Sequence, residues 1–201
     1  MFRKWDKIPR LSNEKFHFSE KIDGTNACVI IIPNSDERLD PNVEPITEVE
    51  VDFDKHGCTY VRVFAQSRSR LIYPNEGGEI KGRDNYGFAQ WVSKNAQQLV
   101  EELKRGYHYG EWFGLGINRG YDLDENRFAL FNPYSQSEIC MNVPQLGSFD
   151  GLAEGVGQCT DQLSHGSYIS PTLGYPAEGM VVYAEKARLY WKIIFEGQKH
   201  G

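Results

Sequence analysis

The order of apolar and polar positions in the first third of the chain predicts β-structure. Residues 16–32 alternate and then become continuously apolar, which predicts a strand, a turn at Asp23-Gly24 and a buried strand. Residues 48–53 and 60–65 alternate strictly, which is typical of a β-hairpin with one solvated face. Residues 54–57 would supply the turn of this hairpin.

The rest of the chain predicts a mixture of helices and core strands. Apolar residues recur at helical spacing from 88 to 104, and Gly106 ends this helix. A short helix is also predicted over 143–149, with a long loop after it that reaches residue 176. Core strands are predicted at 107–113, 127–131, 179–183 and 189–195, and loops at 33–48 and 73–87. This order favours an α+β fold with mostly antiparallel sheets.

Length and composition favour one compact domain over residues 1–201. The chain has 40% hydrophobic residues, which is enough to form a sizeable core. No apolar stretch reaches the length of a transmembrane helix, and the N-terminus lacks the apolar segment of a signal peptide. We therefore expect a cytoplasmic protein with no membrane partner, and no obligate protein partner is evident.

The net charge of −6 argues against a protein that binds nucleic acid over its whole surface. Any nucleic acid must meet a local basic patch, although a solvated surface of mixed charge explains the same residues equally well. The candidate basic residues are Arg62, Arg68, Arg70, Lys81, Arg83, Lys186, Arg188, Lys192 and Lys199.

The four cysteines are scattered, and no two form a Cys-x-x-Cys pair, so we expect free thiols. Neither His56 with Cys58 nor Cys159 with His165 supplies the three or four ligands that a zinc site needs. No transition-metal site is predicted.

Lys21 is the candidate nucleophile. It lies in Glu20-Lys21-Ile22-Asp23-Gly24-Thr25-Asn26, directly before the buried strand, so its amine would be held at the rim of a sheet. Lys-x-Asp-Gly alone usually marks a polar turn. Further polar and aromatic residues at strand ends give this motif more weight, and they are Ser67-Arg68, Gly110-Glu111, Phe128–Phe131, Glu178-Gly179 and Lys192.

In this order the motifs resemble motifs I, Ia, III, IV and V of the covalent nucleotidyltransferases, the superfamily of ligases and capping enzymes. Residues 20–26 and 109–117 are most similar to the RNA ligase 2-type family. The resemblance covers nearly the whole chain and implies a nucleotidyltransferase fold, in which sheets surround a nucleotide-binding cleft with flanking helices. It also implies an ATP-dependent RNA ligase.

The resemblance implies a reaction in three steps. A lysine attacks the α-phosphorus of ATP and forms lysyl-AMP, AMP passes to a 5′-phosphate end, and a 3′-hydroxyl displaces AMP to seal the strand. We expect Mg²⁺ as the metal cofactor, with Mn²⁺ as an alternative. The partner would be a nucleic acid end, in most cases RNA in a nicked or broken duplex.

The resemblance also implies roles for individual residues. Lys21 is the nucleophile, Lys192 contacts the α-phosphate, and Asn26 assists the later steps. The expected nucleotide contacts are Glu20 and Ile22 beside the lysine, Arg68 at a phosphate, Glu111 at a ribose hydroxyl, Phe131 on the adenine ring, and Glu178 at ribose or metal. For Phe131, an ordinary core strand over 127–131 is the competing interpretation.

The chain departs from the family pattern at two positions and in its length. Ile194 replaces a second lysine two residues after Lys192, and Asn132 replaces an aspartate after the aromatic residue. Only nine residues follow Lys192, so we expect no appended C-terminal domain. These departures keep alternatives open: a DNA nick ligase, a guanylyltransferase, or a weakened protein that binds nucleotide or RNA ends without turnover.

The glycine-rich segment 114–120 does not fit a dinucleotide-binding loop. It follows Trp112-Phe113, but no helix and no βαβ unit is predicted after it, and both are needed for that motif.

Overall fold

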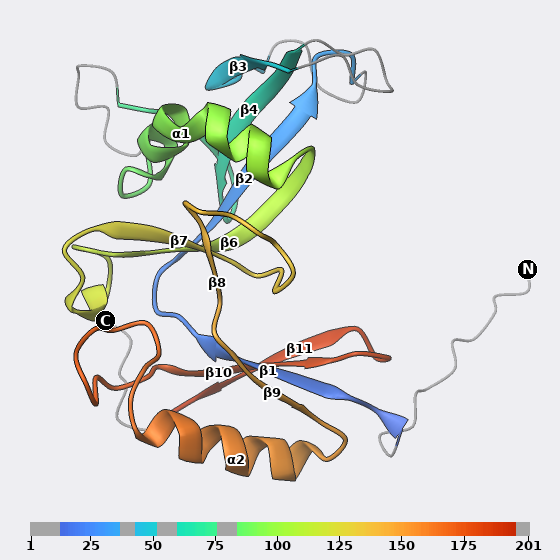
Figure 1. Cartoon of the computed structure of the whole chain (residues 1–201), viewed down its shortest axis with the longest axis vertical. Helices are drawn as coiled ribbons and strands as arrows, with labels where there is room; N and C mark the ends of the chain where they lie inside the picture. The colour runs from blue at the N-terminus through green and yellow to red at the C-terminus, as the bar shows by residue number, and fades with distance from the viewer. Residues whose placement is uncertain (1–12, 37–42, 52–59, 76–83, 196–201) are drawn as a thin grey trace, which may run out of the picture. The chain divides into compact units, whose positions relative to one another are not determined.

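The computed structural model describes residues 13–36, 43–51, 60–75 and 84–195. The chain divides into two compact units (Figure 1). Unit 1 combines residues 1–22 with residues 144–201, and unit 2 consists of residues 23–143. The chain therefore passes between the units after Ile22 and again after Val143.

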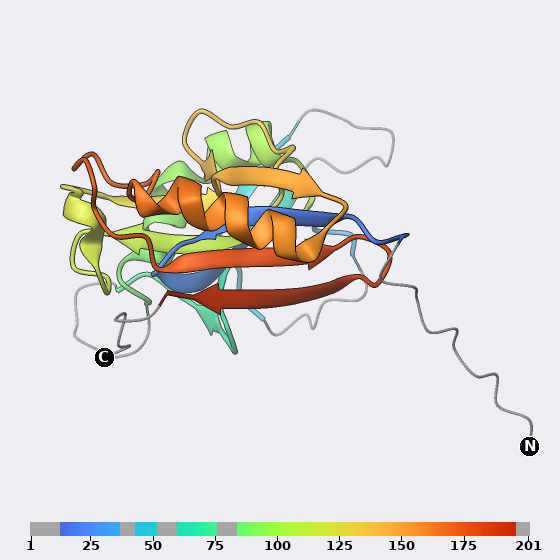
Figure 2. The same ribbon diagram turned by 90° about the horizontal axis from the view of Figure 1, so that it is seen from below.

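Unit 1 contains an antiparallel sheet of four strands in the order β11-β10-β1-β9. The strands are β1 (Phe16–Lys21), β9 (Gln145–Phe149), β10 (Gly179–Ala184) and β11 (Leu189–Ile194). Helix α2 (Leu152–Ser164) lies along one face of this sheet (Figure 2). The core beneath the helix includes Phe16, Phe18, Met180 and Val182.

Strand β1 shows why the sheet has one covered and one open face. Phe16, Phe18 and Glu20 are buried, whereas the alternate residues His17 and Lys21 are partly exposed. Successive side chains of a strand point to opposite faces, so the nucleophile candidate lies on the face opposite the apolar residues.

Unit 2 contains a seven-stranded sheet in the order β3-β4-β2-β6-β7-β8, with β5 paired to β4. Its strands are β2 (Thr25–Pro33), β3 (Thr47–Glu50), β4 (Tyr60–Ser67), β5 (Leu71–Ile72), β6 (Gly106–Gly114), β7 (Asn126–Leu130) and β8 (Met141–Asn142). All pairs are antiparallel except β7 with β8. The prediction of mostly antiparallel sheets is confirmed.

Helix α1 (Phe88–Leu103) covers one face of the seven-stranded sheet (Figure 1). The Asp84 carboxylate accepts hydrogen bonds from the backbone N–H groups of Ala89 and Gln90, which compensates unpaired donors in the first turn. The helix predicted from 88 to 104 is confirmed apart from its last residue. The helix stops at Leu103 because Lys104 takes a left-handed φ of 63°, and Gly106 already opens β6.

The hairpin predicted from residues 48–53 and 60–65 is confirmed as β3 paired with β4, and its turn at 54–57 lies outside the described residues. One side chain contradicts the predicted solvated face. Phe64 is buried because a second apolar cluster with Cys28, Ile30 and Ile32 covers that face.

The helix predicted over 143–149 is wrong. Residues 145–149 form strand β9, and the helix of this region is α2. The pairing of β9 with β1 shifts register between Phe18 and Ser19, which marks a β-bulge. Such a bulge shifts the alternation of side chains, and the apolar residues Val143, Leu146 and Phe149 consequently follow a spacing of three that imitates a helix.

Among the described residues, no helix is long and apolar enough to cross a membrane. The thiols of Cys28, Cys140 and Cys159 are free, as predicted, and all three are buried, whereas Cys58 lies outside the described residues.

Candidate active site

Lys21 ends strand β1 and forms an ion pair with Glu178. Its Nζ donates a hydrogen bond to Glu178 Oε2 at 2.7 Å. The Glu178 side chain is fully buried, and that of Lys21 is 22% exposed. A buried carboxylate is costly without a cationic partner, so this pair fixes the position of the lysine amine.

Gly179 makes this arrangement sterically feasible. It pairs with Lys21 on one side and with Ile194 on the other. A Cβ atom on Gly179 would lie 2.0 Å from the carbonyl oxygen of Ile193, far inside van der Waals contact. Only glycine therefore allows β11 to approach β10 directly after Glu178.

The strand register places two lysines on the open face of the sheet. Lys21, Gly179 and Ile194 form one row, and Ser19, Val181 and Lys192 form the next. Strands β1 and β11 are two strand spacings apart, or about 10 Å. The open face thus carries two candidate phosphate ligands, with Ile194 in the row of Lys21 where the family pattern has a lysine.

Glu20 points away from Lys21, into the covered side of unit 1. Its carboxylate accepts hydrogen bonds from the Ser167 hydroxyl and, at 2.9 Å, from the backbone N–H of Tyr168. Burial raises the pKa of Glu20, and these two hydrogen bonds oppose the rise. The neighbouring Ile22 is buried as well. A nucleotide contact by either side chain stays a prediction.

In unit 2, the Asp23-Gly24 turn is held by the segment that follows β6. Asp23 accepts hydrogen bonds from Asn118 Nδ2 and Arg119 Nε, both at 3.0 Å, and its backbone N–H donates to the Tyr121 hydroxyl at 2.6 Å. Asn118 also donates to the Gly24 carbonyl at 2.8 Å. We call Asn118, Arg119 and Tyr121 the turn clamp.

The turn clamp gives the glycine-rich segment 114–120 a structural role, because Asn118 and Arg119 of this segment hold the Asp23-Gly24 turn. Short 3-10 helix η2 (Gly120–Asp122) follows it, and no α-helix does, so the rejection of a dinucleotide-binding loop agrees with the structure. Glycine is required at position 24 of the turn that the clamp holds, because a Cβ there would lie 2.5 Å from the Trp112 carbonyl oxygen.

Asn26 and Glu111 lie opposite each other on β2 and β6. Asn26 Nδ2 donates to Glu111 Oε2 at 3.1 Å, and both side chains are partly exposed. They lie on the sheet face opposite α1. The hydrogen bond holds an amide and a carboxylate side by side, and groups of these kinds can donate to a phosphate oxygen and accept from a sugar hydroxyl.

Phe131 lies just past β7 and is not a core residue, because its side chain is 45% exposed. Its backbone N–H donates to the Tyr109 carbonyl at 2.9 Å, and Tyr109 is two residues before Glu111 on β6. An exposed aromatic ring near the Asn26–Glu111 pair is suited to stacking on a base. Exposure contradicts the competing core interpretation.

Arg68 follows β4 in a tight turn that leads into β5. The turn is closed by Ser67, whose N–H and hydroxyl both donate to the Arg70 carbonyl. Ser67 pairs with Ala27, so the turn begins beside the strand position next to Asn26. Arg68 is exposed, and its guanidinium is therefore accessible to a phosphate.

Asn132 has a structural use that either asparagine or aspartate could fulfil. Its Oδ1 accepts a hydrogen bond from the Tyr134 N–H at 3.1 Å, which forms an Asx turn. The change from the aspartate of the family pattern thus preserves the local backbone and removes only the charge.

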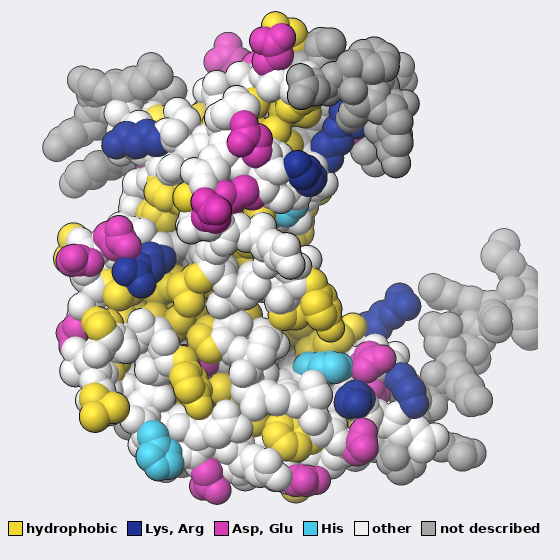
Figure 3. Space-filling model, viewed as in Figure 1, with side chains coloured by type: hydrophobic (Ala, Val, Ile, Leu, Met, Phe, Trp, Pro, Cys, Tyr) yellow, Lys and Arg dark blue, Asp and Glu magenta, His cyan; other side chains and the backbone are white. Residues whose placement is uncertain are grey.

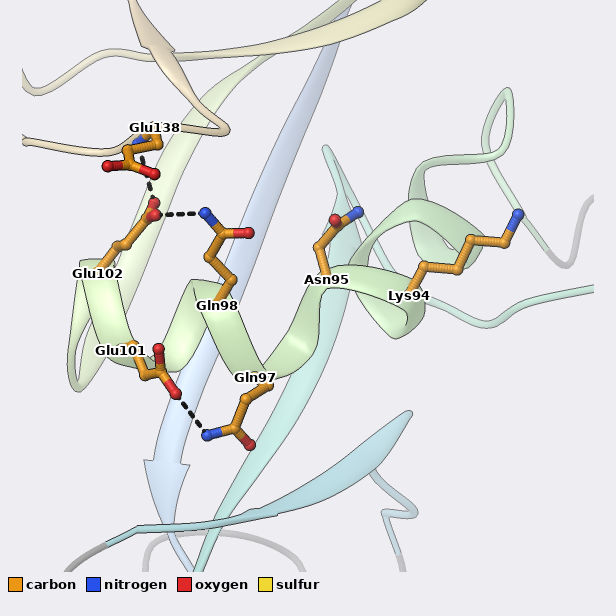
Figure 4. A pocket seen from close by; sticks show the side chains of 7 residues that line it. All are labelled: Lys94, Asn95, Gln97, Gln98, Glu101, Glu102 and Glu138. Atoms are coloured by element: carbon orange, nitrogen blue, oxygen red, sulfur yellow. Dashed lines mark hydrogen bonds between the residues drawn. The ribbon is translucent and has the colours of Figure 1, made fainter.

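A surface pocket of about 490 Å³ lies elsewhere in unit 2, along α1 (Figure 4). Glu101 and Glu102 accept hydrogen bonds from Gln97 and Gln98, and Glu102 also accepts the N–H of Glu138. Acidic side chains gather over this helix in the space-filling view (Figure 3). The three glutamates would repel phosphates, so this pocket is unsuited to a nucleotide.

The described residues contain no group of three histidine, cysteine, aspartate or glutamate side chains that could hold a metal ion. The single carboxylate of Glu178 nevertheless suits Mg²⁺, which takes oxygen ligands and is commonly held by one or two carboxylates together with substrate phosphates.

The predicted site residues are divided between the two units. Unit 1 carries Lys21, Glu178 and Lys192, and unit 2 carries Asn26, Arg68, Glu111 and Phe131. Neither the turn clamp nor the partners of Glu20 were predicted from the sequence. Asn118 and Arg119 are more than ninety residues from Asp23, and no local pattern indicates such a contact.

A family model described as RNA ligase matches residues 14–195. No curated protein sequence matches the chain significantly. Solved structures of mutants of Naegleria gruberi RNA ligase share the fold: one with ATP and Mn has a TM-score of 0.53 at 14% identity, and one with AMP and Mn has 0.52 at 16%. Each alignment covers 92% of this chain, which spans about half the length of those proteins (51% and 50%).

Proposed function

Because the chain belongs to the RNA ligase family, we propose that it is an ATP-dependent RNA ligase that forms lysyl-AMP at Lys21. The ion pair between Lys21 and Glu178 is the observation that carries this proposal. It holds one amine at the end of a strand, on a sheet face that also presents Lys192. We further propose that residues 1–201 act as one adenylyltransferase domain, in the cytoplasm.

The first step joins AMP to the lysine. The amine loses a proton, for which Glu178 Oε2 at 2.7 Å is the nearest described acceptor. Nζ then forms a bond to the α-phosphorus, the bond from that phosphorus to the bridging oxygen of the β-phosphate breaks, and pyrophosphate leaves. Lys192 would stabilise the negative charge that the α-phosphate oxygens gain.

Glu178 is the residue that would hold Mg²⁺ or Mn²⁺ together with the triphosphate. The cation supplies charge neutralisation to the phosphates and to the departing pyrophosphate. The similar Naegleria gruberi RNA ligase structures are with ATP and Mn or with AMP and Mn, which supports the use of a divalent cation by this chain as well.

The later steps would use the polar residues of unit 2. Arg68 would bind a phosphate through its planar fork, Glu111 a ribose hydroxyl, and Phe131 the adenine ring. Asn26 would donate its amide to a phosphate oxygen during AMP transfer and sealing. The exposure of Phe131 and the hydrogen bond between Asn26 and Glu111 support these assignments. The substrate would be a 5′-phosphate RNA end and a 3′-hydroxyl.

Labelled nucleotides test the proposal. The protein is incubated with Mg²⁺ and ATP or GTP labelled at the α-phosphate, and label that survives denaturation is measured. We expect label from ATP in the wild type and in Lys94→Ala, whose lysine is exposed on α1, and none in Lys21→Ala or Lys21→Arg. Retained label in Lys21→Arg would refute Lys21 as the attachment site.

Ile194 favours one second candidate, a protein that binds nucleotide or RNA ends without turnover. An apolar side chain stands in the row of Lys21, where a further cation would help to bind phosphates. Absence of covalent label with either nucleotide, combined with measurable ATP binding, would support this candidate. If label forms, nicked duplexes of RNA, DNA and hybrids identify the strands that are sealed.

A further inference from the structure

Three rings form a row across the open face of the four-stranded sheet. His17 on β1 pairs with Tyr183 on β10, which pairs with Tyr190 on β11. The rings of Tyr183 and Tyr190 stack with centroids 4.5 Å apart and planes 28° apart, and those of His17 and Tyr183 are 6.1 Å apart at 29°. We call these three residues the aromatic row.

The aromatic row lies on the same face as the candidate nucleophile. His17 and Lys21 are four residues apart on β1, or about 14 Å, and share a side of the strand. Lys192 lies between, two residues from Tyr190 on β11. The open face therefore presents an amine for the reaction, a cation for a phosphate and then a set of rings, in that order.

The outer end of the row is accessible. Strand β11 is the edge of the sheet, and Tyr190 is 70% exposed although one side of its ring stacks on Tyr183. Partial burial, with a contribution from the Tyr183 phenol, raises the pKa of Tyr190. A tyrosine phenol is uncharged at neutral pH even without this rise, so Tyr190 does not repel a phosphate.

The inner end of the row is held in place. His17 Nδ1 lies 2.7 Å from the Ser148 hydroxyl, and Nε2 lies 3.1 Å from Glu185 Oε2. These contacts fix the imidazole plane against which Tyr183 stacks. A fixed stack loses little side-chain entropy when another flat group is added to it.

We propose that the aromatic row is a stacking platform for bases of single-stranded RNA adjacent to the end that is joined. This proposal rests on the proposed function, because it identifies the strand beyond the reacting phosphate. Proteins that bind single strands combine cations along the backbone with aromatic rings on which bases stack, and the open face offers both in Lys192 and the aromatic row. Stacking of this kind is tolerant of sequence, since every base has a flat face.

The platform is tested by RNA binding in the absence of ATP. A short, 3′-fluorescent single-stranded RNA with a 5′-phosphate is titrated with the full chain at one fixed salt concentration, and its anisotropy is recorded. Stacking is worth about 1–3 kcal/mol per base, so Tyr190→Ala should raise the Kd roughly 5- to 150-fold. Tyr190→Leu should weaken binding similarly, because it keeps apolar surface but removes the ring, whereas Tyr190→Phe should bind like the wild type.

Trp191→Ala is the matched control. Trp191 is the next residue of the same strand, is 49% exposed and points to the opposite face. We expect its loss to leave RNA affinity within twofold of the wild type. A second control uses an RNA whose nucleotides lack bases; its affinity should be insensitive to Tyr190→Ala, since stacking is absent there.

The outcomes separate the platform from the proposed function. Unchanged Kd in Tyr190→Ala, equal weakening in Trp191→Ala, or no RNA binding by the wild type would each overturn the platform. Lysyl-AMP formation is scored separately on the same preparations. If no lysyl-AMP forms but RNA binding depends on the Tyr190 ring, the platform stands and the ligase assignment fails.

Discussion

Gly179→Ala should destabilise unit 1 strongly, because glycine at this position sets the spacing of β10 and β11. A Cβ atom would lie 2.0 Å from the Ile193 carbonyl oxygen and 3.0 Å from Ile194 Cα. Ordinary contacts of a carbon with these atoms begin above 3.0 Å, so the strands must separate by roughly 1 Å at this point. The φ of Gly179, 157°, adds strain for any residue with a side chain.

The magnitude follows from what the separation disrupts. Overpacking of a well-packed site costs about 1–3 kcal/mol. Weakening of one or two backbone hydrogen bonds between β10 and β11 adds about 1 kcal/mol each. We therefore expect a loss of about 2–5 kcal/mol, or about 4–20 °C in Tm for a chain of this size.

Gly157→Ala is the control for this experiment. Gly157 lies within α2, and a Cβ there would meet nothing within 4 Å. Alanine is the better helix former by roughly 0.5–1 kcal/mol, so this variant should equal or exceed the wild type in stability. Urea unfolding followed by circular dichroism measures both variants. An unchanged unfolding midpoint for Gly179→Ala would show that the spacing of β10 and β11 does not require glycine at this position.

Three further predictions concern the carboxylates and thiols of the described residues. Glu178→Gln keeps a hydrogen bond to Lys21 but removes the charge, so we expect the free energy of unfolding to fall by about 1–2 kcal/mol and the Tm by about 2–8 °C. Labelling by ATP should also be slower in this variant. Unchanged labelling would exclude a part for this carboxylate in the reaction. Burial raises the pKa of Glu20, so its ionisation destabilises the fold increasingly as pH rises above the ordinary glutamate range. Glu20→Gln should therefore gain stability relative to the wild type from pH 4 to pH 7. A difference in unfolding free energy that stays constant over this range would contradict the raised pKa. Burial also raises the pKa of the Cys28 thiol to about 12 and that of the Cys140 and Cys159 thiols to about 11. Native protein at pH 8 should therefore resist iodoacetamide at these three positions in peptide mapping, whereas urea-unfolded protein should react.

The central strands were predictable because the pattern of apolar residues in the sequence matches the burial of their side chains in the fold. Residues 16–32 alternate where one face of β1 is open, and become continuously apolar where β2 is covered on both faces by α1 and by the cluster around Phe64. The same double coverage explains why Phe64 departed from the predicted solvated face. A single strand does not reveal what covers its second face.

Helix α2 was missed because its glycines weaken the local helical signal. Gly155 lowers helix propensity, yet a Cβ there would lie 2.4 Å from Phe18 Cε2, so the close packing of α2 on β1 requires glycine. Tertiary packing overrides propensity at this residue. The bulge of β9, by contrast, placed apolar residues at a spacing typical of a helix.

The site was predictable in its residue types but not in their partners. The order of motifs identified Lys21, Glu111 and Glu178 as candidates from the sequence alone. That Lys21 pairs with Glu178, which is 157 positions away, depends on the pairing of β1 with β10. The turn clamp and the aromatic row likewise arise from contacts between distant segments.

Mapping of the nucleotide adduct tests the central claim most directly. The protein is incubated with ATP and Mg²⁺, digested, and searched by mass spectrometry for a peptide that carries AMP through an acid-labile bond. We predict the adduct on Lys21 and its absence after incubation without nucleotide. An adduct on another residue, or none on a folded protein that binds ATP, would contradict the account.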